Sequence, residues 1–132
     1  MLKSIFFIIS FCVISLTSNC GLEAHVKPII SKGPNGSEAH IKDRHWHNSN
    51  AVNTSSFKKS IKMSNLVKIT SVAINKGKHG VGNNGYLSHE YTFKKPIGES
   101  QGGIPRKTLR VITDPKRSNG QNAYVVTAFP VK

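Results

Sequence analysis

The hydrophobic pattern of the chain changes at Tyr86, and this change constrains the fold more than any other feature. From there on, short stretches rich in β-branched and aromatic residues alternate with turn signals, at residues 86–93, 108–113 and 123–129. Glycine and proline in residues 94–107 mark a long connection, and residues 114–120 mark a turn. A helical part followed by a meander of strands predicts an α+β fold with an antiparallel sheet.

Helical signals precede this change. Apolar residues recur at helical spacing between Leu66 and Ala73, after an N-cap candidate at Ser64, and Gly77 follows as a stop signal. The pattern predicts a helix between that cap and that stop, although residues 67–70 also fit the alternation of a strand.

Two flanking segments are less regular. Ser55 and Ser56 are cap candidates for a short turn that places Phe57 and Ile61 on one face. Residues 77–85 contain so much glycine that they predict a loop.

The start of the chain has the composition of a secretory signal. Lys3 precedes an almost unbroken apolar run, and small and polar residues follow it, so residues 1–20 predict a signal peptide and an exported protein. Residues 21–37 contain two prolines and several glycines without a sustained period, which predicts a flexible tether. The basic α+β domain is then expected over residues 38–132.

The two cysteines leave no internal disulfide in that domain. Cys12 lies inside the expected signal, and Cys20 lies at its end. Cys20 occupies the position of a lipidated cysteine in a bacterial lipoprotein, but a plain secreted protein fits as well. Either way, a domain of this size has to fold on its hydrophobic core alone.

Charge points to a polyanionic partner. The chain has 19 Lys and Arg against six Asp and Glu, a formal net charge of +13. Removing Lys3 with the signal leaves +12. A nucleic acid, an anionic membrane surface and an acidic protein are the partner classes that such an excess fits, and a merely basic soluble surface is the alternative.

Histidines and charged residues gather at residues 38–50. His40, His45 and His47 lie within eight residues, beside Trp46, which is expected to anchor the core. Histidine titrates near neutral pH, so one pair can supply both the base and the acid of an RNA cleavage, which needs no metal or cofactor. A three-histidine metal site and histidines without a role remain alternatives.

Several short motifs resemble the toxin nuclease modules grouped with barnase, the colicin nucleases and bacterial EndoU. The resemblance spans residues 38–132, and the motifs lie in the order typical of that group: Ala39-His40-Ile41-Lys42-Asp43-Arg44-His45, Ser55-Ser56-Phe57, Arg110-Val111-Ile112-Thr113-Asp114, Gly120 and Val125-Val126-Thr127-Ala128-Phe129-Pro130. This chain departs from the group in that the module directly follows a signal. The second histidine of EndoU-type enzymes also lies further from the first than His45 does from His40.

The resemblance implies an α+β ribonuclease, often one that acts on tRNA, with His40 and His45 as the acid–base candidates. We expect His40 to be the general base and His45 the general acid. Thr127 would hydrogen-bond the phosphate, and Arg110, beside it in the sheet, would offset the developing charge. Lys94 matches the lysine of EndoU-type enzymes, and Lys95 is nearly as good a match. The remaining residues expected to bind substrate are Arg44, His47, Lys95, Arg106 and Lys107.

These observations predict a metal-independent endoribonuclease toxin that leaves a 2′,3′-cyclic phosphate. Its expected partners are RNA and an acidic inhibitor protein attracted by opposite charge, and its high net charge favours a monomer. The rival interpretation is an exported basic protein without enzymatic activity, which binds nucleic acid or an anionic envelope surface.

Overall fold

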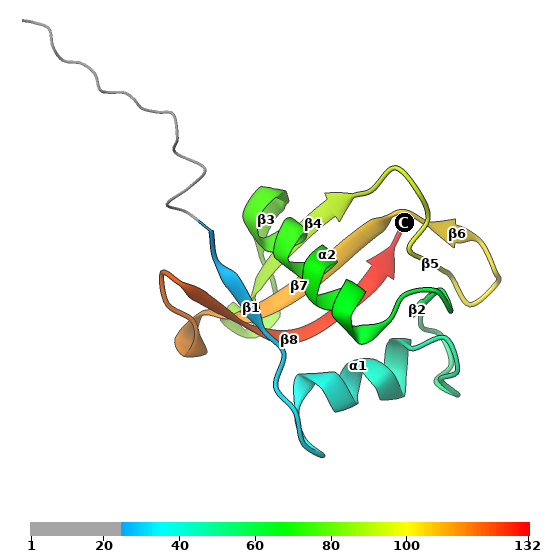
Figure 1. Cartoon of the computed structure of the whole chain (residues 1–132), viewed down its shortest axis with the longest axis horizontal. Helices are drawn as coiled ribbons and strands as arrows, with labels where there is room; N and C mark the ends of the chain where they lie inside the picture. The colour runs from blue at the N-terminus through cyan, green and yellow to red at the C-terminus, as the bar shows by residue number, and fades with distance from the viewer. Residues whose placement is uncertain (1–24) are drawn as a thin grey trace, which may run out of the picture.

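The computed structural model describes residues 25–132, which form a mixed α+β structure (Figure 1). Its larger sheet has five strands in the order β1-β8-β7-β4-β3, and its smaller sheet has three in the order β2-β5-β6. The two α-helices of this part are α1 (Ser37–His45) and α2 (Met63–Lys76). Residues 1–24, which include the expected signal peptide and Cys20, lie outside the described part.

The three long strands of the larger sheet confirm the strands expected from the sequence. They are β4 (Leu87–Thr92), β7 (Thr108–Asp114) and β8 (Asn122–Val131), and they pair antiparallel in that order. The expectation of a purely antiparallel sheet is wrong, because β1 (Lys27–Ile29) pairs parallel with β8. The sheet is therefore mixed.

Helix α2 confirms the predicted helix and supplies much of the core. Leu66 and Ala73 are fully buried on it and belong to one apolar cluster with Leu109 and Val111 of β7. The N-cap is Lys62 rather than Ser64, because the Asn65 side chain accepts a hydrogen bond from the Lys62 backbone N–H. Tertiary packing thus fixes the helix, while local capping fixes where it begins.

Two segments predicted as irregular contain strands. Within the expected tether, residues 27–29 form β1, and the Asn75 side chain of α2 hydrogen-bonds both the N–H and the C=O of Val26. Residues 77–85 are not a loop throughout, since β3 (Lys78–Val81) pairs antiparallel with β4 before a short 3-10 turn, η3 (Asn83–Gly85). In both segments the ladder supplies order that the local composition does not.

The turn expected at Ser55 and Ser56 is also corrected. Ser56 belongs to β2 (Ser56–Phe57), which pairs antiparallel with β5 (Gly98–Glu99), and β5 pairs with β6 (Pro105–Arg106). Phe57 is buried by this pairing rather than by a helical turn. The glycine- and proline-rich connection therefore contains two strands of the smaller sheet, β5 and β6.

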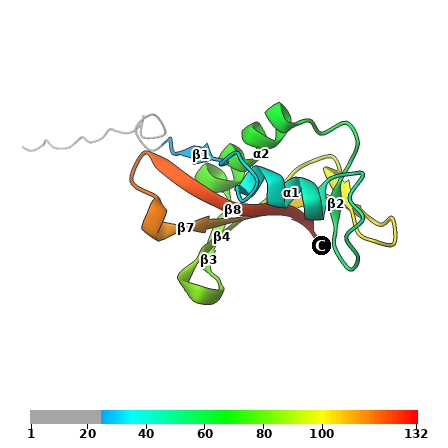
Figure 2. The same cartoon turned by 90° about the horizontal axis from the view of Figure 1, so that it is seen from below.

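Both helices lie on one side of the larger sheet (Figure 2). Helix α2 packs against β4 and β7, and α1 packs along β8. No helix of the described residues covers the opposite side, which we call the open face. Within this part of the chain, no helix is long and apolar enough to cross a membrane.

Candidate functional site

The open face carries the residues of β7 and β8 that the sequence marked as functional. Arg110 lies opposite Phe129, and Ile112 lies opposite Thr127. Directly opposed residues of an antiparallel pair share a face. Leu109 is fully buried on the side of α2, so its neighbour Arg110 points to the open face. Ile112, Thr127 and Phe129 lie on the same face as Arg110.

A β-bulge interrupts the pairing of β7 with β8. The register shifts after Ile112, which lies opposite Thr127, so that Thr113 lies opposite Val125 and Val126 is left without a partner. An extra residue of this kind bends the strand and re-aims its side chains. Val126 lines a pocket together with His40.

Helix α1 brings the two candidate histidines to the edge of β8. Ser37, Ile41 and His45 are its buried residues, spaced four apart on one helical face. The start of the helix is held by Ser31, whose hydroxyl accepts from the Ser37 N–H while its own N–H donates to the Ser37 hydroxyl. These contacts fix α1 against β8 and thereby fix the position of His40 and His45.

His45 is held as a proton acceptor. The residue is only 8% exposed, and its ring stacks on Phe129 with the two ring centroids 4.9 Å apart. Nδ1 lies 2.9 Å from the backbone oxygen of Ser55. A carbonyl oxygen only accepts, so Nδ1 carries the hydrogen and Nε2 keeps a free lone pair.

Burial lowers the pKa of His45, which keeps the ring neutral. The hydrogen bond to Ser55 acts in the opposite direction, and the nearby charges of His40 and Arg44 add smaller lowering effects. A neutral imidazole with a fixed tautomer and a free Nε2 has the form of a general base near neutral pH.

His40 is the exposed partner of His45. The two ring centroids are 6.2 Å apart and the rings meet edge to face. The spacing is close enough for both rings to reach one phosphodiester. His40 lines the pocket of Val126, while His45 lines a neighbouring pocket with Phe129 and Arg106. The expected acid–base pair is therefore brought together by the fold, one ring at the edge of each pocket.

Thr127 has a hydroxyl that the described residues leave unused. Its Oγ1 is the one buried side-chain nitrogen or oxygen among them without a hydrogen-bond partner. Buried polar groups are normally satisfied, so an orphan beside a candidate site calls for an explanation.

Arg110 is engaged by a carboxylate instead of being free. Its Nε and a terminal nitrogen lie 2.6 and 2.5 Å from the same oxygen of Glu90, the residue opposite it on β4. Strands β7 and β8 do pair as expected, but Arg110 lies opposite Phe129 and not Thr127. Its charge is thus partly neutralised in this structure.

Lys94, which was expected to be catalytic, and the residues expected to bind substrate are spread over several places. Arg106 joins His45 in its pocket, together with the C-terminal Lys132. Lys94 and Lys95 line a different pocket with Lys58, beside Tyr91 and Phe93. Exposed positions are occupied by the rest, namely Arg44, His47 and Lys107.

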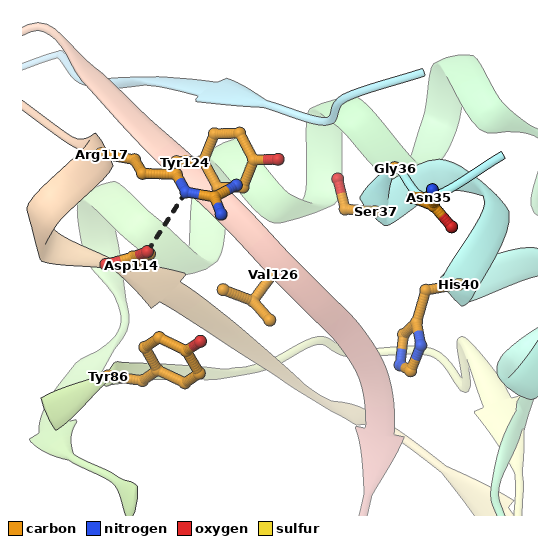
Figure 3. Close-up of a pocket in the computed structure, with 9 residues that line it drawn as sticks. All are labelled: Asn35, Gly36, Ser37, His40, Tyr86, Asp114, Arg117, Tyr124 and Val126. Atoms are coloured by element: carbon orange, nitrogen blue, oxygen red, sulfur yellow. Dashed lines mark ion pairs between the residues drawn. The ribbon is translucent and has the colours of Figure 1, made fainter. Parts of the chain in front are cut away.

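Residues that the sequence did not single out complete the surroundings of His40. Its pocket is also lined by Tyr86, Arg117 and Tyr124 (Figure 3). Tyr86 lies just before β4, Arg117 belongs to η4 (Pro115–Arg117) and Tyr124 belongs to β8. Because they are far apart in the sequence, only the folded structure identifies them as neighbours. Trp46 meets Phe57 edge to face and packs against the core, which confirms its expected role as an anchor.

A second histidine pair lies on the helix-covered face. Nδ1 of His79 on β3 and Nδ1 of His89 on β4 are 2.7 Å apart, and Nε2 of His89 is 2.8 Å from the Thr113 hydroxyl. Burial, with a smaller contribution from His79, lowers the pKa of His89 to about 4. Residues 25–132 contain no group of three or more His, Cys, Asp or Glu arranged to hold a metal ion.

No family model, curated protein or solved structure matches this chain. The evidence for its function therefore comes from the geometry around α1 and β8 and from the charge of the chain.

Proposed function

We propose that this protein is an endoribonuclease that cleaves RNA through attack by the 2′-hydroxyl, without a metal or cofactor. The observation that carries the proposal is the state of His45. Its Nδ1 is bound to the backbone oxygen of Ser55, its Nε2 is free, and its ring centroid lies 6.2 Å from that of the exposed His40. Proton transfer by positioned histidines is a common source of rate enhancement.

In the proposed reaction, Nε2 of His45 takes the proton of the 2′-hydroxyl. The 2′-oxygen then bonds to the adjacent phosphorus, and the bond from phosphorus to the 5′-oxygen breaks. Protonated His40 gives its proton to that leaving oxygen. The products are a 2′,3′-cyclic phosphate and a 5′-hydroxyl, and proton exchange with water restores both rings.

The phosphate oxygens gain charge in this step, and hydrogen-bond donors stabilise them. The Thr127 hydroxyl is the proposed donor, because it has no other partner. It is covered in this structure, so a phosphate oxygen reaches it after the side chains above it shift. Arg110 offsets the charge once a phosphate competes with Glu90 for its guanidinium.

The charge of the chain supports RNA as the substrate. A formal net charge of +13 attracts a polyanion over a long range, and the attraction weakens with salt. In keeping with the proposal, the protein acts as an exported toxin domain on RNA of the tRNA class, acts as a monomer, and is restrained by an acidic inhibitor protein.

The test is to incubate the purified protein with total tRNA in EDTA, beside the variants His40→Ala, His45→Ala and, as a matched control, His79→Ala. Discrete fragments that end in 2′,3′-cyclic phosphate are expected from the wild type and from the control only. Intact tRNA that all four proteins retard in a gel would reject the enzyme and favour the basic binding protein. Lys58, Lys94 and Lys95 line one pocket and form no ion pair within residues 25–132, which favours that second candidate.

A further inference from the structure

We infer that the pocket beside His40 binds a nucleobase of the RNA strand, an inference that rests on the proposed function. The pocket has a volume of about 250 Å³ and is lined by Val126 of the bulge, Tyr86 and Tyr124. Figure 3 shows the two tyrosines on opposite sides of the pocket, with Val126 between them. Aromatic walls and an aliphatic side chain fit a flat, weakly polar ring.

Tyr86 offers an unused aromatic face. Tyr91 packs edge to face against Phe93, and Tyr124 lies under the guanidinium of Arg117, whereas the described residues give Tyr86 no ring or cation partner. The residue is half-buried and its ring lines the pocket. Unpaired RNA bases are bound by stacking on such aromatic side chains.

The opposite wall is held rigid by its own contacts. The Arg117 guanidinium carbon lies 4.6 Å from the centroid of the Tyr124 ring, and its Nε lies 3.5 Å from a carboxylate oxygen of Asp114. The Tyr124 hydroxyl hydrogen-bonds Ser31 at 2.9 Å. Asp114 in turn accepts from the Lys116 backbone N–H. This wall is therefore ordered before a ligand arrives, which reduces the entropy that binding has to overcome.

Polar groups at the rim suit the edge of a base. Asn35 contributes an amide with both donors and an acceptor, Asp114 contributes carboxylate oxygens, and Arg117 contributes donors in one plane. A pocket for phosphate alone would not need two aromatic walls and would be disfavoured by the carboxylate.

The position of His40 orients the bound nucleotide. Its imidazole lies at the end of the pocket away from Asp114 and Arg117 (Figure 3). A base stacked on Tyr86 would therefore direct its ribose and phosphate toward His40, the proposed proton donor. The pocket would then hold a nucleotide next to the scissile bond.

The experiment is a calorimetric titration of the full protein with the four 5′-ribonucleoside monophosphates, beside ribose 5-phosphate as the probe without a base. Tyr86→Leu removes the stacking face, and Tyr86→Phe is the matched control that keeps it. At least one mononucleotide is expected to bind about tenfold more tightly than ribose 5-phosphate. Tyr86→Leu should remove most of that advantage, and Tyr86→Phe should retain it.

Backbone amide shifts of the wild type provide a second measurement that does not depend on how the variants fold. The mononucleotides are expected to shift Tyr86, Val126 and Arg117 more than ribose 5-phosphate does. Equal affinity for ribose 5-phosphate and all four nucleotides, or shifts confined to other parts of the chain, would overturn the inference.

Failure of the proposed function would look different. The mononucleotides contain no phosphodiester to cleave, so their binding is independent of the reaction. If the wild type leaves tRNA intact, the cleavage proposal fails even where the pocket binds a base. If tRNA is cleaved while the pocket ignores the base, only this inference fails.

Discussion

Two histidine pairs lie in different parts of the molecule, one on strands β3 and β4 and the other on helix α1, and they differ in the hydrogen bonds that their nitrogens make. On the helix-covered face, His79 and His89 bond to each other, and the remaining nitrogen of His89 bonds Thr113. At the edge of β8, His45 binds Ser55 through Nδ1 and has no partner at Nε2 among the described residues, and its ring centroid is 6.2 Å from that of His40.

The comparison shows that closeness of two histidines is a poor guide to chemistry. The rings of His79 and His89 are nearer to each other, with centroids 4.9 Å apart, yet both nitrogens of His89 are occupied. A base needs an unoccupied nitrogen that substrate can reach. His89 fails that criterion, whereas exposed His79 keeps an Nε2 without a partner among the described residues. What sets His45 apart is the close contact of its ring with Phe129 and with a second histidine, and we propose His40 and His45 as the catalytic pair for that reason.

The largest expected effect is on cleavage rate. His45→Ala and His40→Ala should each lower kcat on tRNA by roughly 10²- to 10⁴-fold, because each removes a proton-transfer group. His79→Ala should change kcat less than about twofold, within the ordinary range of a surface substitution. Single-turnover cleavage measures all three, and a comparable loss in His79→Ala would break the distinction between the pairs.

The second prediction concerns stability against pH. The pKa of His89 is about 4 in the folded protein and about 6.5 when unfolded, so between these values the unfolded chain binds more protons. The contribution of neutral His89 is complete above pH 6.5 and is lost as pH falls from 6.5 to 4, on the order of 2 kcal/mol.

Thermal melts of the wild type and of His89→Gln across that window measure this loss. Glutamine does not titrate, so the variant should lose less stability as pH falls. His45, whose pKa is also lowered, contributes to both proteins alike and cancels in the difference. Parallel curves for the two proteins would show that His89 is not the group responsible.

The third prediction compares the stability of two threonine variants. Thr113→Val leaves the Nε2 of buried His89 without its partner, so it should lower the free energy of unfolding by about 1–3 kcal/mol. Thr127→Val removes a hydroxyl that has no partner, so stability should stay within about 0.5 kcal/mol or rise.

Cleavage should respond in the reverse order. Thr127→Val should slow cleavage about tenfold by removing a phosphate donor, and Thr113→Val should leave the rate of the folded protein nearly unchanged. Urea titrations and cleavage assays on both variants separate these outcomes. Full activity in Thr127→Val would remove that residue from the proposed site.

The smallest effect is expected from releasing Arg110. Glu90→Gln removes the carboxylate that engages it, and both side chains are substantially exposed, so stability should change by less than about 1 kcal/mol. Cleavage should rise about twofold because the guanidinium becomes available to phosphate. Matched rate measurements at low and high salt check this, and a slower variant would place Glu90 itself among the residues that support cleavage.

The sequence predicted the elements that carry their own periodic signal. Helix α2 and strands β4, β7 and β8 are long enough for apolar spacing to identify them, and those elements build most of the core. Strands β1 and β3 were missed because they are short and lie in proline- or glycine-rich stretches. Their pairing partners determine their conformation, and β1 is separated from β8 by most of the chain.

The candidate site was predictable only in part for a similar reason. The spacing of His40 and His45 within one segment marked them as a pair, and α1 holds them together. Tyr86, Arg117 and Tyr124 carry no joint signal, because they meet only after the sheet has formed. Glu90 was missed as well, since its partner Arg110 is identified by the register of β4 with β7.

The bulge at Val126 has a consequence for how this chain tolerates insertion and deletion. Buried positions on β8 are Ala123 and Val125 before it, and Ala128 and Pro130 after it, so the buried parity switches from odd to even numbers. With strict alternation, Thr127 and Phe129 would point into the core. The bulge takes up this one extra residue and so keeps Thr127 and Phe129 on the open face. Deleting Val126 would leave both side chains on that face by ordinary alternation, whereas straightening the bulge with Val126 in place would turn both toward the core.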